Sequence, residues 1–146
     1  MQLHSITELL AIQNYHESYM VFHNKNRIDL VLEQTTIVPP VCSGCGYVHN
    51  TSVHSRGKMV VEDLPISGKR VFLHVPKRKL ICREDGRIHV EALDWIQGRF
   101  TKRFAEQVYR LTSITTNQEA GWYLGLDDET VYRLSLIHIS EPTRPY

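Results

Sequence analysis

The chain has 146 residues, of which 42% are hydrophobic and 23% charged, and its formal net charge is +1. This length allows one ordinary domain or two very small ones, and the composition excludes a disordered chain. No apolar run is long enough to span a bilayer, and the first residues lack the features of a secretory signal, so we expect a cytoplasmic protein without membrane contact. Between His54 and Arg110 stand 13 Lys or Arg and 7 Asp or Glu, which makes the centre of the chain basic.

Residues 1–40 are expected to form an N-terminal helix and a β-hairpin. Ser5-Ile6-Thr7-Glu8 has the form of a capping box, which predicts a short helix directly after it. From residue 17 to residue 35, apolar and polar side chains alternate around a polar tip, as in two paired strands. Two consecutive prolines end this hairpin.

Residues 41–94 are expected to form a small antiparallel β domain. Its segments are rich in β-branched residues and the first two are separated by turn-forming residues. The three predicted strands are 58–65, 70–76 and 77–82. Pro65 and Pro76 are expected at strand ends, because proline cannot donate a hydrogen bond to a neighbouring strand.

The same domain has the layout of a zinc ribbon. Cys42-Ser43-Gly44-Cys45-Gly46 has the form of a tight metal-binding turn, a zinc knuckle, and Cys82 follows after the strands. Three cysteines in a reducing compartment favour metal binding over disulfides. We therefore expect Zn²⁺ held by Cys42, Cys45 and Cys82, and we expect the ion to stabilise a sheet with little interior of its own.

The fourth zinc ligand remains open at the level of sequence. Asp85 stands where a second Cys-x-x-Cys knuckle would have its last cysteine, and a carboxylate oxygen can bind zinc. His89 is the alternative fourth ligand, and His49 and His54 could approach from the other side. In a further alternative, the three thiols only pack as small apolar groups around a site without metal.

The C-terminal third changes to a helical pattern. Apolar residues spaced by four, four and three predict a helix over residues 101–112; they are Phe100, Phe104, Val108 and Leu111. Two shorter helical pieces follow, broken at Gly125, and Asp127 is a suitable cap for the second. Both tryptophans, Trp95 and Trp122, are expected to pack between segments.

Residues 95–133 have the spacing of a helix-turn-helix. In Gly121-x3-Gly125-x5-Val131, a small residue allows close approach, a glycine makes the turn and an aliphatic residue anchors the second helix. The residues predicted to face a DNA groove are Thr130, Tyr132 and Arg133. The residues predicted to bind phosphate are Lys77, Arg78, Lys79, Arg99, Lys102 and Arg103. Two packed helices that bind no nucleic acid are the alternative.

The tail, residues 134–146, is expected to be non-native. Its sequence is what one frame of the transposon mosaic-end and adapter DNA used in library sequencing encodes, so we interpret it as read-through and expect the native frame to stop near Arg133. The predicted fold class is thus α+β, a small antiparallel β zinc ribbon followed by a shortened helix-turn-helix segment.

The order of "CSGCG", "DLPISGKRV", "KLICR" and "GRFTKRFAE" resembles the amino-terminal region of ISL-type insertion-sequence transposases. The resemblance implies a zinc ribbon and a helix-turn-helix that precede an RNase-H-like catalytic domain carrying an acidic triad. It places the knuckle ligands on Cys42, Cys45, Cys82 and Asp85, the last of which departs from the family's cysteine.

The resemblance also implies that the chain recognises duplex DNA at the terminal inverted repeats of an insertion sequence, for DNA transposition. It assigns no catalytic residue here, so we expect a fragment that binds DNA and is not itself an enzyme. A homodimer is an open possibility for the full-length protein. The alternative functions are those of a zinc ribbon that binds RNA or of a protein-interaction module.

Overall fold

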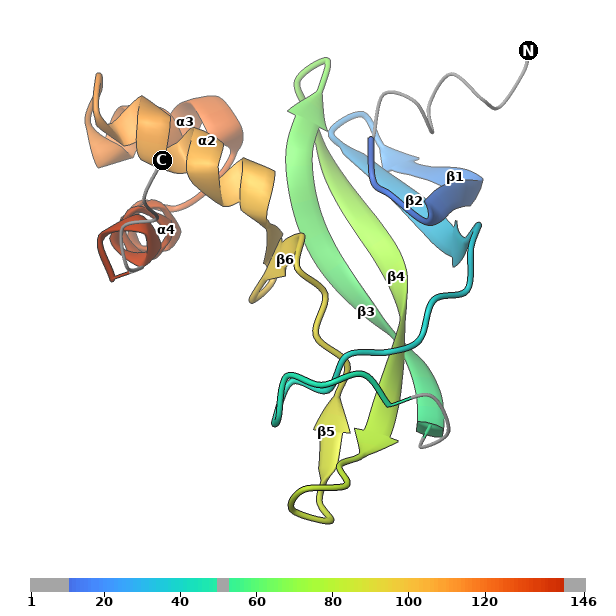
Figure 1. The fold of residues 1–146 in the computed structure, drawn as a ribbon. Helices are drawn as coiled ribbons and strands as arrows, with labels where there is room; N and C mark the ends of the chain where they lie inside the picture. The colour runs from blue at the N-terminus through green and yellow to red at the C-terminus, as the bar shows by residue number, and fades with distance from the viewer. Residues whose placement is uncertain (1–10, 50–52, 141–146) are drawn as a thin grey trace.

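The computed structural model describes residues 11–49 and 53–140, with side chains up to Leu136. A seven-stranded sheet stands beside three packed helices, which confirms the α+β class (Figure 1). The elements in chain order are β1 (Tyr15–Asn24), β2 (Arg27–Gln34), β3 (Val53–Ile66), β4 (Lys69–Ile81), β5 (Ile88–Val90), β6 (Ile96–Gln97), β7 (Phe100–Thr101), α2 (Lys102–Thr112), α3 (Asn117–Leu124) and α4 (Asp128–Ser140). The helix predicted after Ser5 lies almost wholly outside the described residues.

The sheet is mixed, where the sequence predicted a purely antiparallel one. Its order is β1-β2-β4-β3-β7-β6, with β5 paired to β4, and the pairs β2–β4 and β3–β7 are parallel. The predicted hairpin is confirmed as β1 and β2. After β2 the chain passes to the far end of the sheet, and β3 and β4 form a second hairpin, so that β4 runs in the same direction as β2.

The second hairpin consists of two long strands and not of three short ones. β3 has 14 residues and β4 has 13, joined by a turn in which Ser67 and Gly68 both have positive φ. Pro76 was predicted at a strand end but lies within β4. On one edge Pro76 pairs with Lys58 of β3. On the other edge β4 is paired to β2 only up to His74 and to β5 only from Lys79, so Pro76 lies in a gap between these two neighbours, where no hydrogen-bond donor is required.

The sheet has a hydrophobic core of its own. Buried side chains from β1 to β4 form one cluster, made of Tyr15, Ile28, Leu30, Leu32, Val61, Val71, Leu73 and Val75. Trp95 packs against this cluster, as expected, with its ring edge against Tyr15 at a centroid distance of 5.5 Å. No metal ligand belongs to this cluster, so the sheet has an interior of its own, and the predicted dependence of the fold on zinc stays a prediction.

The three helices surround a second core. Thr101 caps α2 through a hydrogen bond from the Phe104 amide, and Phe104 and Val108 on the predicted face are fully buried. α3 begins with a capping box between Thr116 and Glu119. Among the helices of the described ranges, none is long and apolar enough to cross a membrane.

The two glycines of the predicted motif fix the joint between α3 and α4. Gly125 has φ 73°, the left-handed conformation that ends α3. A Cβ on Gly121 would lie 2.5 Å from the carbonyl oxygen of Leu126, so the small residue predicted there has to be glycine, because alanine would not fit. As predicted, Asp127 caps α4, accepting from the Thr130 amide at 2.6 Å, and Val131 is buried against the other helices.

α4 continues beyond Arg133 into the segment interpreted as read-through. Leu134 is buried in the helical core, one turn after Val131. The helix extends to Ser140, and the predicted origin of residues 134–146 stays a prediction.

Two buried carboxylates on β3 lie where the helices meet the sheet, and one of them, Asp63, attaches α2. Asp63 accepts from Thr101 Oγ1 at 2.7 Å and from Arg103 Nε at 2.8 Å. Glu62 binds both Nε and Nη2 of Arg70 at 2.8 Å, beside Gly125. Arg103, predicted as a phosphate ligand, instead holds α2 against β3.

We expect Gly121→Ala to destabilise the helical unit by about 1–3 kcal/mol, because the added methyl group forces the α3–α4 joint apart. Thermal unfolding monitored by circular dichroism would measure the effect. Gly57→Ala is the matched control, since a Cβ there meets open space. Equal stability of the Gly121 and Gly57 variants would show that the joint tolerates a side chain.

Candidate metal centre

The first knuckle is a closed backbone loop. The Cys42 amide donates to the Tyr47 carbonyl at 2.9 Å, and the Cys42 carbonyl accepts from the Gly46 amide at 2.9 Å. Gly46 has φ 78°, which explains a glycine after the second cysteine. The loop brings the thiols of Cys42 and Cys45 close to that of Cys82, which directly follows β4.

The second knuckle repeats these hydrogen bonds around Cys82. Its amide donates to the Arg87 carbonyl at 2.8 Å, and its carbonyl accepts from the Gly86 amide at 2.9 Å. Gly86 has φ 69°, a left-handed conformation like that of Gly46 in the first knuckle. The backbone thus keeps the form of a zinc knuckle although Asp85 stands at the position of the second cysteine.

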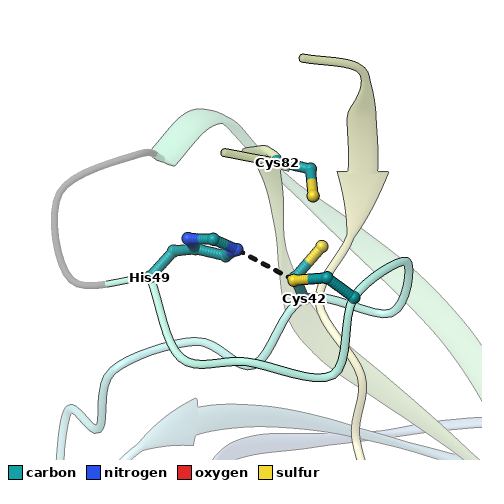
Figure 2. Close-up of side chains that lie close together, drawn as sticks. Cys42, His49 and Cys82 are labelled. Carbon is teal, nitrogen blue, oxygen red and sulfur yellow. Dashed lines mark hydrogen bonds between the residues drawn. The ribbon is translucent and has the colours of Figure 1, made fainter. Parts of the chain in front are cut away.

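Four ligand atoms from two segments, residues 42–49 and the end of β4, converge between the knuckles. The three cysteine sulfurs and a ring nitrogen of His49 all lie within 4.8 Å of one another. His49 Nε2 lies 3.2 Å from the sulfur of Cys45, and the His49 amide donates to the Pro40 carbonyl, which fixes the loop. Figure 2 shows Cys42, His49 and Cys82 pointing toward one another.

This donor set fits zinc. Tetrahedral zinc with Zn–S near 2.3 Å and Zn–N near 2.0–2.1 Å requires ligand atoms roughly 3.3–3.8 Å apart, so only small movements would close the four atoms around one ion. Cys42, His49 and Cys82 are buried, as in structural sites. The Cys45 amide donates to the Cys42 sulfur and lowers the pKa of that thiol, which favours the thiolate that binds metal.

The structure places Asp85, the predicted fourth ligand, outside this group of four. Its carboxylate accepts from His89 Nε2 at 2.7 Å and from the Arg87 amide at 2.7 Å. The His89 hydrogen bond and then the Arg87 amide hold the pKa of Asp85 below its ordinary value. Geometry therefore favours His49 as the fourth ligand over Asp85 and over His89, while His54 is exposed and lies outside the group.

We expect His49→Ala to weaken zinc binding at this site by about a hundredfold to a thousandfold, since four ligands share about 10–16 kcal/mol in zinc fingers. Competition with a colorimetric chelator would measure this affinity. His54→Ala and Asp85→Ala are expected to keep the zinc ion of this site at full affinity. Retention of full affinity by His49→Ala, with a loss in Asp85→Ala, would restore Asp85 as the fourth ligand.

The predicted DNA-binding residues are scattered over the ribbon and the helices. Lys79, Arg99, Tyr132 and Arg133 are exposed, and Lys77 and Lys102 are half-buried. Arg133 pairs with Glu129 one turn earlier on α4. Thr130 is half-buried and lines a hollow between α4 and the sheet, together with Glu62 and Phe72.

Arg78 was predicted to bind phosphate, but it is 5% exposed and lies inside the protein. Its Nε and Nη2 donate to the Glu91 carboxylate at 2.9 Å and 3.0 Å, and its amide donates to the same carboxylate at 2.7 Å. On the neighbouring strand, Arg56 and Lys58 are exposed and were missed. The sequence analysis chose phosphate ligands from the three consecutive basic residues 77–79 and passed over Arg56 and Lys58, which are not adjacent in sequence.

Comparison with known proteins locates the centre within a described family. Residues 38–85 match the family model described as the zinc-finger of transposase IS204/IS1001/IS1096/IS1165. The chain is also 33% identical over 111 residues to a protein of Bordetella parapertussis described as "Transposase for insertion sequence element IS1001". That alignment covers 71% of this chain and 26% of the relative, so the chain spans about a quarter of its length. No solved structure matches the chain.

Proposed function

Because residues 38–85 match the zinc-finger model of insertion-sequence transposases, we propose that this chain is the DNA-binding part of such an enzyme. It binds the terminal inverted repeats of the element as duplex DNA, for transposition by the full-length protein. Catalysis belongs to other parts of that protein. Two inverted repeats per element make a homodimer of the full-length protein a natural arrangement.

The α3–α4 joint carries this proposal. Three residues, Gly125 to Asp127, connect the helices, and the missing side chain at Gly121 lets the Leu126 backbone approach α3. A three- or four-residue turn with glycine is typical of a helix-turn-helix. In this assignment α4 is the recognition helix and presents Tyr132 and Arg133, both exposed, to the major groove.

The basic residues of the ribbon supply sequence-independent affinity in the same proposal. Lys79 is exposed on β4, and Arg56 and Lys58 are exposed on β3 of the same hairpin. Arg99 is exposed directly before β7. The acidic start of α4, at Asp128 and Glu129, repels phosphate, so the backbone contacts are assigned to the ribbon and to Arg99.

A mobility-shift series across salt concentration tests this function, with duplex DNA from the region flanking the coding sequence. We expect log affinity to fall linearly with log salt, and the R56A/K58A/K79A/R99A variant to flatten the slope by about 0.9 for each phosphate that the protein no longer neutralises. Lys25→Ala, in the turn between β1 and β2, is the matched control. Affinity that is indifferent to salt would contradict DNA binding, and a preference for single-stranded RNA would support the RNA-binding alternative.

An exposed apolar surface on α3 favours protein interaction as the second candidate. Trp122 was expected inside but is 87% exposed, and Tyr123 and Ile114 beside it are also exposed. Such surfaces are common at contacts between proteins. The mobility-shift series separates the candidates, because a module that only binds proteins would shift neither DNA nor RNA.

A further inference from the structure

The two knuckles form a longer internal repeat than the cysteine spacing suggested. "CSGCGYVH", residues 42–49, and "CREDGRIH", residues 82–89, share cysteine at the first place, glycine at the fifth and histidine at the eighth. The backbone hydrogen bonds at the first, fifth and sixth places are the same in both. Asp85 and His89 are thus the counterparts of Cys45 and His49, which belong to the zinc site.

Asp85 and His89 also meet next to a zinc ligand. Their carboxylate oxygen and ring nitrogen lie within 4.8 Å of each other and of the Cys82 sulfur. The His89 ring rests on Gly44 of the other knuckle, where a Cβ would lie 2.7 Å from Nε2. The glycine between the first two cysteines therefore makes room for His89 beside the metal centre.

One Zn²⁺ ion does not neutralise the negative charge of the candidate ligands. Three thiolates and the Asp85 carboxylate carry four negative charges when both histidines are neutral, and one Zn²⁺ offsets two of them. Cys42 and Cys82 are buried, where uncompensated charge is costly. A second divalent cation at Asp85 would bring the centre to neutrality.

We propose that Cys82, Asp85 and His89 form a second zinc site, joined to the first by the Cys82 thiolate as a bridging ligand. The three residues supply one sulfur, one oxygen and one nitrogen, and water completes the tetrahedron. Asp85 is 42% exposed and His89 27%, so this ion faces solvent and exchanges readily, while the ion of the inner site does not.

Metal counting by native mass spectrometry tests the proposal on the purified chain loaded with zinc. We expect two equivalents in the unmodified protein, of which a weak chelator removes one. The D85N/H89Q variant should hold one equivalent that resists the chelator. Glu84→Gln, an exposed carboxylate in the same loop, is the control and should keep two.

Each other result overturns the second site. One equivalent in the unmodified protein would mean that a protonated His89 neutralises Asp85 instead. Two equivalents in D85N/H89Q would mean an adventitious ion only, and none would assign Asp85 and His89 to the first site. Cadmium-113 resonances add an independent readout: two signals are expected, with the single-thiolate site upfield of the three-thiolate site. Metal counting involves no nucleic acid, so failure here leaves the DNA-binding proposal untouched.

Discussion

Removal of zinc is expected to unfold the two knuckles together with β5 and the end of β4, and to leave the rest of the sheet and the helices folded. The cluster at the knuckles contains only Cys42, Leu80 and Cys82 as buried residues among those that the structure describes, with Cys45 and Val53 against it. Without metal this interior is too small to order the loops, and zinc binding in such sites contributes most of the local folding free energy. The β1–β4 core and the helical core, as described, contain no metal ligand.

Hydrogen exchange followed by mass spectrometry would measure this outcome with and without a chelator. We expect amide protection to vanish for residues 41–49 and 80–91 and to persist for residues 28–32 and 104–111. Cys82→Ser should reproduce the chelated pattern without a chelator present. Simultaneous loss of protection in all four regions would show that the ion supports the whole fold, as the sequence alone suggested.

Loss of the Glu91 carboxylate is expected to be among the most destabilising single changes in the chain. In Glu91→Ala, the Arg78 guanidinium would keep its charge inside the protein without a partner, and breaking such a buried pair costs about 3–5 kcal/mol. The carboxylate also accepts the Arg78 amide of β4, and the Glu91 amide donates to the Arg78 carbonyl. An arginine side chain stays protonated at any ordinary pH, so deprotonation offers no relief in the variant.

Urea unfolding followed by tryptophan fluorescence would give the free energy of each variant. Lys79→Ala, next in sequence but exposed, is the matched control and should change stability by less than about 0.5 kcal/mol. The R78M/E91L double variant removes both charges and should recover much of the loss. A Glu91→Ala protein as stable as Lys79→Ala would mean that water reaches Arg78.

Local patterns of the sequence predicted the helices and the first knuckle well. The spacing of Phe104 and Val108, the cap at Asp127 and the break at Gly125 are all short-range features, and each was confirmed. The Cys-x-x-Cys-Gly pattern is also a short-range feature, because the five residues of the knuckle themselves require the left-handed conformation of Gly46.

Residues whose role depends on a distant segment were harder to predict. Arg78 stands between two lysines in a run that suggests a solvated surface, but alternate residues of a strand point to opposite faces. The partner of Arg78 is Glu91, 13 residues later, and nothing in the sequence of the basic run predicts this ion pair. His49 was only one of several candidates, although the repeat of Cys, Gly and His at the same spacing in both knuckles could have singled it out.

The length of β4 sets a distance between the two ends of the molecule. Ten residues separate Arg70, beside the α3–α4 turn, from Leu80, which packs under the knuckles. An extended strand rises about 3.3 Å per residue, so the two ends stand at most roughly 33 Å apart. One turn of B-form DNA measures about 34–36 Å. In a protein that grips a duplex at both ends, this strand acts as a spacer of one helical turn, and protected nucleotides should recur with that period along one side of the DNA.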